Sequence, residues 1–146
     1  MSRRLSAIAA CAAMASFAVP FAARAATVKV KLEDMTDHGV KKMEIVATPA
    51  TVKAGPITFD IKNYSKYLEH EMLVVKPEPH GKPFPYNTKG NQIIESKIDK
   101  LEDSGDLQPG NKVVTHVTLK PGKYVLLCNE PGHYKAGMWT WLHVKG

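Results

Sequence analysis

The chain has 146 residues and a formal net charge of +6 at pH 7. This length suits one domain rather than several. No cluster of Lys and Arg is dense enough to indicate nucleic-acid binding, so the charge indicates at most a mild preference for acidic partners.

The first 25 residues have the features of a secretory signal peptide. Two arginines open the segment, residues 5–22 form an uncharged, Ala-rich run, and Ala23-Arg24-Ala25 matches the small-x-small cleavage rule. We therefore expect cleavage after Ala25, export to the periplasm and a mature domain of residues 26–146. A membrane anchor is the alternative, but the run of about 18 residues is near the lower limit for a span and ends at a cleavage site. We expect no stable membrane insertion.

Removal of residues 1–25 changes both the charge and the cysteine count. It takes away Cys11 and all three arginines, so that 121 residues remain, with 17 lysines against 14 acidic residues and a net charge of +3. Cys128 is then the only thiol of a chain sent to an oxidising compartment, and it can form no internal disulfide. A metal would occupy such a thiol, whereas a buried, inert cysteine is the alternative.

The rest of the chain has the sequence pattern of an all-β protein. Short runs in which apolar residues alternate with polar ones, or which are apolar throughout, are separated by turns with Pro and Gly. We expect strands at 27–32, 43–47, 57–62, 70–75, 113–119, 124–128 and 139–144. Such a series predicts a β-sandwich or barrel.

One segment departs from this pattern. Residues 77–85 contain four prolines, which predicts an extended loop. Residues 91–103 then place apolar side chains roughly on one helical face and charged side chains outside it, and Gly105 follows as a stop signal. The sequence therefore predicts a loop-plus-helix insertion between two strands.

The most informative motif lies near the C-terminus. Four residues separate Cys128 from His133, and four separate His133 from Met138, on a loop rich in Pro and Gly between two apolar runs. Soft sulfur donors together with imidazole suit copper, which cycles between Cu(I) and Cu(II). With a second histidine, this is the donor set of a mononuclear copper electron-transfer site, with two His and one Cys in a plane and a weak axial Met.

The second histidine has to come from elsewhere in the chain. His70 follows a loop and opens an apolar strand, from which its side chain can reach a site at the end of a sandwich, and we choose it. His80 and His116 are the main alternatives. His38 lies in a polar turn and His143 on the expected outer face of the last strand.

The C-terminal part of the chain resembles a known family. The stretches Pro121–Cys128 and Pro131–Met138 look like those of the cupredoxins, the small blue-copper proteins such as plastocyanin, azurin and pseudoazurin. The two gaps of four residues are similar to those of rusticyanin and auracyanin. The resemblance runs from Ile57 to Val144. It implies an eight-stranded Greek-key β-sandwich with one copper ion at one end.

The resemblance also implies the ligands. His70, Cys128 and His133 match the equatorial positions, and Met138 matches the axial one. In many cupredoxins an Asn or Ser follows the first histidine and helps to order the ligand loops. Here that residue is Glu71, whose carboxylate cannot donate a hydrogen bond, although its backbone N–H can contact the Cys128 sulfur.

Together these features predict an exported, monomeric protein that carries single electrons between redox proteins such as cytochromes or copper oxidoreductases. The alternative is a periplasmic protein that buffers or sequesters copper for resistance, although no His- or Met-rich tail favours it. We do not expect an enzyme, because the chain has no His-x-His pair and no second domain. A Cys–His hydrolase built on Cys128 and His133 would leave Met138 unexplained.

Two tryptophans of the last predicted strand should point outward. Alternation from Leu142 and Val144 places Trp139 and Trp141 on the outer face. We expect the N-terminal strand or the loop at 77–85 to cover them, and a partner surface is the alternative.

Overall fold

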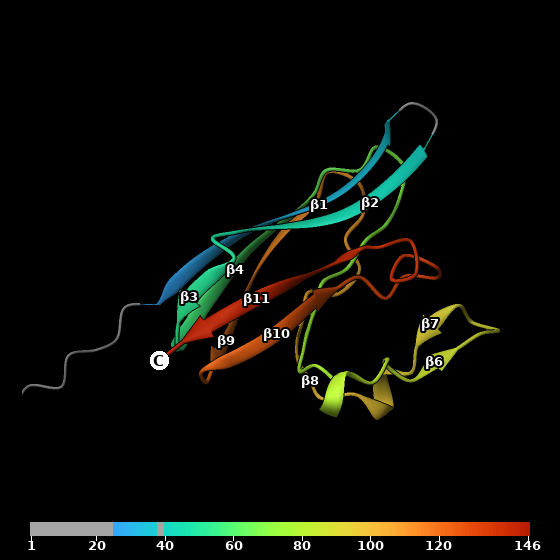
Figure 1. Ribbon diagram of the computed structural model, residues 1–146. Coiled ribbons are helices and arrows are strands. Elements are labelled where there is room, and N and C mark those ends of the chain that lie inside the picture. The colour runs from blue at the N-terminus through green and yellow to red at the C-terminus, as the bar shows by residue number, and fades with distance from the viewer. Residues whose placement is uncertain (1–24, 38–39) are drawn as a thin grey trace, which may run out of the picture.

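Two β-sheets stacked on each other make up the computed structural model in Figure 1, which describes residues 25–37 and 40–146. The first sheet has the order β2-β1-β4-β9, with β1 at Ala26–Asp37, β2 at Val40–Thr48, β4 at Gly55–Asn63 and β9 at Lys112–Leu119. The second has the order β3-β11-β10-β5-β8, with β3 at Thr51–Lys53, β11 at Trp139–Lys145, β10 at Gly122–Leu127, β5 at Leu73–Val75 and β8 at Lys100–Asp103. The signal peptide that we expect lies outside the described residues, except for Ala25.

The core lies between the two sheets, as the alternating runs predicted. On β4 the inward side chains Ile57, Phe59 and Ile61 are buried, and they belong to one cluster with Leu126 and Leu142 of the second sheet. The sequence order of the strands jumps within and between the sheets, which agrees with a Greek key. The predicted all-β sandwich is confirmed.

A second, smaller apolar cluster lies on the outer face of the second sheet. Successive β10 residues serve both clusters, because Leu126 faces the main core while Val125 and Leu127 face the other way. Phe84 and Ile98 of the insertion after β5 pack on this outer face. The insertion therefore covers the sheet on the side that would otherwise be exposed.

Trp139 and Trp141 point outward from β11, as predicted. They remain 41% and 39% exposed. Their rings meet edge to face at 6.1 Å and form one wall of a groove of about 230 Å³, which Pro77, Pro83 and Phe84 also line. The loop at 77–85 thus lies beside the two tryptophans without burying them.

The prediction of a helix at 91–103 is wrong. This segment contains β7 (Gln92–Ile93), which pairs with β6 (Tyr86–Asn87), then a 3-10 turn at Glu95–Lys97, and then β8. The Asn129 side chain accepts a hydrogen bond from the Ile93 N–H at 2.7 Å and donates one to the Ile93 carbonyl at 3.1 Å. These bonds replace helical ones. Of the apolar residues that suggested a helix, Ile93 and Ile98 pack instead against β5 and β10, and Leu101 packs against the main core.

The remaining short element is a 3-10 turn at Pro79–Gly81 in the proline-rich loop. Among the described residues, no helix is long and apolar enough to cross a membrane. In Figure 1 the loop that follows β10 lies at the end of the sandwich away from the C-terminus, towards the β6–β7 hairpin. That end of the molecule carries the cysteine motif.

Candidate metal centre

Three side chains that are far apart in the sequence meet at this end of the sandwich. The His70 Nδ1 lies 3.2 Å from the His133 Nδ1, and the Cys128 Sγ lies 4.0 Å and 3.4 Å from these two nitrogens. His70 and Cys128 are completely buried, whereas His133 is half-buried. The structure thus brings together three of the four residues that the sequence nominated.

The spacing of the three donor atoms suits a metal ion. A circle through the two nitrogens and the sulfur has a radius of about 2.1 Å, which is a usual length for bonds from imidazole and thiolate to a metal. The three atoms are all close enough to one another to hold a single ion. The donor set and its dimensions therefore fit a trigonal metal site.

His70 is held by backbone hydrogen bonds to Leu107 and by the chain that precedes it. Its N–H donates to the Leu107 carbonyl at 3.1 Å, and its own carbonyl accepts from the Leu107 N–H at 2.7 Å. Upstream, the buried Asn63 side chain donates to the carbonyls of Leu68 and Leu107 and accepts from the Ser65 N–H. This network replaces the strand expected from residue 70, since β5 begins only at Leu73.

The other donors come from one tight loop that follows β10. The Cys128 N–H donates to the Met138 carbonyl at 3.0 Å, and the Met138 N–H donates to the His133 carbonyl at 3.0 Å. The His133 N–H in turn donates to the Glu130 carbonyl at 2.9 Å. The backbone therefore folds His133 and Met138 back towards the end of β10, as the Pro and Gly residues of the loop predicted.

Gly132 shows why the loop needs glycine. It has a φ of +86°, a left-handed conformation that is unfavourable for residues with a side chain. A Cβ at this position would lie 2.8 Å from the Asn91 Nδ2, and the Gly132 N–H donates to the Asn91 carbonyl at 2.7 Å. This close contact fixes the ligand loop against the β6–β7 hairpin.

The position of Met138 agrees in part with its predicted role as the axial ligand. Its side chain is completely buried in the main core cluster, which also contains Cys128. Its backbone bonds to both Cys128 and His133 keep it beside the donor triangle. Its thioether as a fourth donor remains a prediction.

The protein environment favours uncharged side chains at the three donor atoms. Burial raises the pKa of the Cys128 thiol to about 12, although backbone N–H groups oppose the shift. Burial also lowers the pKa of His70 and of His133. A neutral imidazole is the form that binds a metal, whereas the thiol has to release its proton when a metal enters.

The histidines that the sequence left as alternatives lie elsewhere. His116 is exposed on β9 and contacts the Thr58 hydroxyl at 3.1 Å. His80 is exposed in the 3-10 turn at Pro79–Gly81, and His143 lies on β11 opposite Lys123. His38 lies outside the described residues. Within the described part of the chain, His70 is thus the one histidine that joins Cys128 and His133.

Comparison with solved structures identifies the fold. A reduced auracyanin from Roseiflexus castenholzii matches with a TM-score of 0.57 and 23% identity, over 84% of this chain and 98% of its own. Auracyanin A from Chloroflexus aurantiacus matches with 0.55 and 20%, over 82% and 98%. Rusticyanin from Thiobacillus ferrooxidans matches with 0.59 and 18%, over 82% and 76%. The chain has the cupredoxin fold. No family model matches the sequence, and no curated protein sequence matches it.

Within this cupredoxin fold, Glu71 links the two halves of the site. Its backbone N–H points at the Cys128 Sγ from 3.5 Å, as the sequence predicted. Its carboxyl group accepts a hydrogen bond from the Asn129 N–H at 3.1 Å. Burial, followed by the charges of nearby acidic residues, raises the pKa of Glu71 to about 8. At neutral pH the group is therefore mostly uncharged.

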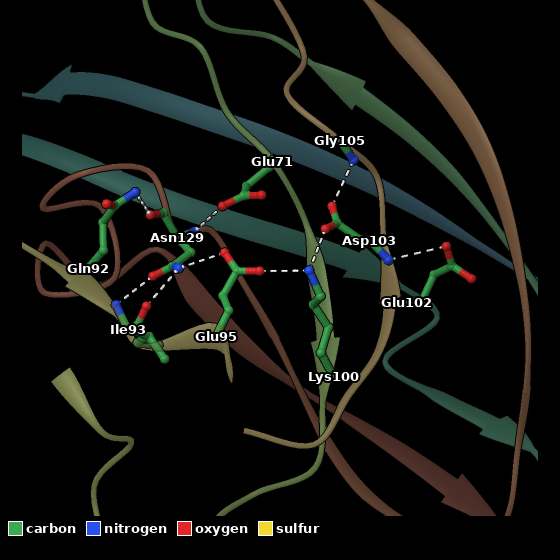
Figure 2. A network of polar contacts seen from close by, with 9 residues as sticks. All are labelled: Glu71, Gln92, Ile93, Glu95, Lys100, Glu102, Asp103, Gly105 and Asn129. Carbon is green, nitrogen blue, oxygen red and sulfur yellow. Dashed lines mark hydrogen bonds and ion pairs between the residues drawn. The ribbon is translucent and has the colours of Figure 1, made fainter. Parts of the chain in front are cut away.

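Figure 2 shows that Asn129 extends this link into the insertion. Its side-chain amide bridges Ile93 and Glu95, and its carbonyl accepts from the Gln92 side chain at 2.9 Å. Lys100 then joins Glu95 to Asp103 through bonds of 2.6 Å and 2.7 Å. The residue after the cysteine is thus tied to β7, to the 3-10 turn and to β8.

Sequence reasoning missed three supporting residues, namely Asn63, Asn129 and Asp34. The Asp34 Oδ1 lies 3.6 Å from the His70 Nε2, on the side of the imidazole away from the other two donor atoms. A signal was present in the sequence, because Asp34 continues the inward alternation of Val30 and Leu32 on β1. A carboxylate at an inward position of a strand needs a partner, and here its Oδ1 faces the His70 Nε2.

Proposed function

We propose that this chain is a mononuclear type 1 copper protein that carries single electrons. The observation that carries the proposal is the triangle of one cysteine sulfur and two imidazole nitrogens at one end of a cupredoxin fold. One thiolate and two imidazoles in a plane are the donors of blue-copper electron-transfer sites. Auracyanin A, one of the structures with this fold, is described as a "blue" copper protein.

We assign the axial position to Met138. Its side chain is buried, and its backbone is hydrogen-bonded to both Cys128 and His133. A thioether is a soft donor, which favours copper over zinc, magnesium or calcium. Four protein donors leave no open position for a substrate, which supports electron transfer rather than catalysis.

When copper is bound, it supplies the one-electron couple, and the protein supplies the geometry and the path. His70 and Cys128 are sealed from solvent, while His133 is half-buried. The His133 imidazole is therefore the donor through which an electron leaves or enters. Exposed Pro131 and Ala136 and half-buried Tyr134 lie on the same loop. A small apolar surface of this kind suits the weak, brief contacts of redox proteins such as cytochromes or copper oxidoreductases.

Export to the periplasm is part of the proposal. It rests on the signal-like segment at residues 1–25 and on the single cysteine that remains after its removal. Expression of the full chain followed by mass spectrometry of the periplasmic fraction tests it. The expected product begins at Ala26, and a product that keeps residues 1–25 in the membrane fraction contradicts export as a released protein.

The decisive experiment is the visible and EPR spectrum of purified protein loaded with copper. We expect an intense thiolate-to-copper absorption band, and we expect Cys128→Ser to lose it. Met138→Leu should keep the band and change the reduction potential, because the axial ligand tunes that potential. A wild-type protein that binds no copper, or binds it without the thiolate band, contradicts the proposal.

A second measurement separates electron transfer from copper buffering, which would use the same four residues. A carrier accepts electrons rapidly from a reduced cytochrome and passes them on without releasing copper. Normal respiratory electron transfer in a deletion strain that has become sensitive to copper would instead favour buffering.

A further inference from the structure

Two buried polar atoms face each other behind the metal site without a hydrogen-bond partner. They are the Oδ1 of Asp34 and the Nε2 of His70, and they lie 3.6 Å apart. A buried polar atom without a partner costs about 1–3 kcal/mol, so such a pair needs an explanation. The two atoms are complementary, because a carboxylate oxygen accepts and a protonated ring nitrogen donates.

The orientation of the His70 ring decides which nitrogen carries the proton. The Nδ1 points to the Cys128 Sγ and the His133 Nδ1, so it has to be free of a proton when it binds a metal. In a neutral imidazole the proton is then on the Nε2, which faces Asp34. A shortening of a few tenths of an ångström turns this contact into a hydrogen bond.

Asp34 is placed for this contact by the sheet opposite the cysteine loop. It lies on β1, and Leu32 of the same strand is in register with Asn63 of β4. The Tyr64 N–H donates to the Leu32 carbonyl at 2.8 Å, which ties β1 to the segment that leads to His70. The carboxylate is therefore held on a strand of the sheet, and the segment that leads from β4 to His70 is tied to the same strand.

We propose that Asp34 is a positioning residue for the copper site, which accepts the Nε2–H hydrogen bond of His70 and thereby fixes its ring and its tautomer. This inference rests on the proposed copper function. The negative charge of the carboxylate also lies behind a copper ligand, where it favours Cu(II) over Cu(I). Asp34 thus contributes to the reduction potential although it does not touch the metal.

Two substitutions separate the hydrogen bond from the charge. Asp34→Asn keeps an acceptor oxygen and removes the charge, whereas Asp34→Ala removes both. Loss of an outer partner of a ligand histidine typically weakens metal binding about 10- to 100-fold, and we expect this range for Asp34→Ala. We expect Asp34→Asn to weaken Cu(II) binding more than Cu(I) binding. A tenfold difference between the two corresponds to a rise of about 59 mV in the reduction potential.

Glu33→Gln is the matched control. It removes the same charge from the neighbouring residue of β1, whose side chain points to the other face and lies 3.7 Å from the Lys31 Nζ. If the potential responds to charge near the strand in general, Glu33→Gln and Asp34→Asn shift it alike, which overturns the inference. A shift in Asp34→Asn alone supports it.

A measurement without copper keeps this inference separate from the function on which it rests. In 15N-labelled, metal-free protein, we expect the His70 imidazole to carry its proton on Nε2 and to exchange it slowly. In Asp34→Ala the exchange should become fast, and in Asp34→Asn it should stay slow. Equal exchange in all three proteins overturns the role of Asp34, whatever the copper spectrum shows. If the wild-type protein binds no copper but its His70 Nε2 proton exchanges slowly, the proposed copper function is contradicted. The hydrogen bond between Asp34 and His70 is then still supported.

Discussion

The carboxyl group of Glu71 accepts a hydrogen bond from the backbone N–H of Asn129 at 3.1 Å. Glu71 follows His70, and Asn129 follows Cys128, so this one bond joins the two chain segments that bring the metal donors together. Burial and the surrounding acidic residues raise the pKa of Glu71 to about 8. The Glu71 carboxyl group is therefore mostly uncharged at neutral pH and becomes a buried anion as the pH rises through about 8.

Replacement of Glu71 by Gln should remove a pH dependence of stability. The pKa of Glu71 is raised in the folded protein from 4.5 to about 8, so the folded state holds a proton that the unfolded state has lost between these values. Its contribution to the free energy of unfolding is present below pH 4.5 and is lost as the pH rises through 8, by up to about 1.4 kcal/mol per pH unit. Glu71→Gln keeps an acceptor for the Asn129 N–H and has no proton to lose.

Urea unfolding of the metal-free protein at pH 5, 7 and 9 measures this effect. The stability of Glu71→Gln relative to wild type should increase with each step. Glu78→Gln, in the proline-rich loop, serves as the control and should follow the wild-type pH profile. Parallel profiles for Glu71→Gln and wild type would show that Glu71 is ionised throughout this range.

Truncation of Asn129 should cost more stability than truncation of an asparagine at the surface. The buried Asn129 side chain satisfies both backbone groups of Ile93, at 2.7 Å and 3.1 Å. Asn129→Ala leaves these groups without a partner, and we expect a loss of about 1–3 kcal/mol in the free energy of unfolding. Asn87→Ala is the control, because Asn87 is exposed and its side chain binds only turn N–H groups, those of Lys89 and Gly90. Equal losses in urea unfolding would contradict a structural role for Asn129.

The strands with clear alternation could be predicted because each one carries its own signal. The inward residues of β4 alternate with polar ones, and the turn before β10 has its own Pro and Gly. The segment 91–103 lacks such a signal. Its isoleucines resemble a helical face, but they are β-branched, and the backbone of Ile93 is bound by Asn129, which lies 36 residues further along the chain. A hydrogen-bond partner that far along the chain leaves no pattern in the sequence of the segment itself.

The candidate metal centre likewise has residues that the sequence could predict and residues that it could not. Cys128 and His133 could be predicted because they lie on one loop with fixed spacing, and the role of Met138 on the same loop stays a prediction. His70 was a choice among several histidines, and the fold, which returns the segment before β5 to the same end, made it the correct neighbour. The inward position of Asp34 could be predicted from the alternation of Val30 and Leu32, but its neighbour His70 could not, because the contact crosses from one sheet to the segment between the sheets.

Gly132→Ala should destabilise the ligand loop for two separable reasons. The positive φ of +86° is unfavourable for alanine by about 1–2 kcal/mol, and the new Cβ would meet the Asn91 Nδ2 at 2.8 Å. Gly105→Ala carries the first cost without the second, since φ there is +65° and nothing lies within 4 Å. Thermal unfolding should therefore show a larger loss for Gly132→Ala, and in an Asn91→Ala background the loss caused by Gly132→Ala should fall to that of Gly105→Ala. Equal losses at both glycines would mean that the Asn91 side chain moves aside freely.

The thiol of the metal-free protein should react slowly. Cys128 is completely buried, and its pKa is raised from 9.0 to about 12. Because the thiolate is the reactive form, this shift lowers its fraction at pH 8 by about 10³-fold, in addition to the steric protection by the loop. Reaction with a disulfide reagent should therefore be at least about 10³-fold slower in native protein than in 6 M urea, where about 10% of a thiol with an ordinary pKa is ionised at pH 8. His133→Ala opens the exposed side of the site and should accelerate the reaction, whereas His116→Ala, on the outer face of β9, should not. A native rate equal to the unfolded rate would show that the loop is open most of the time and that burial does not protect the thiol.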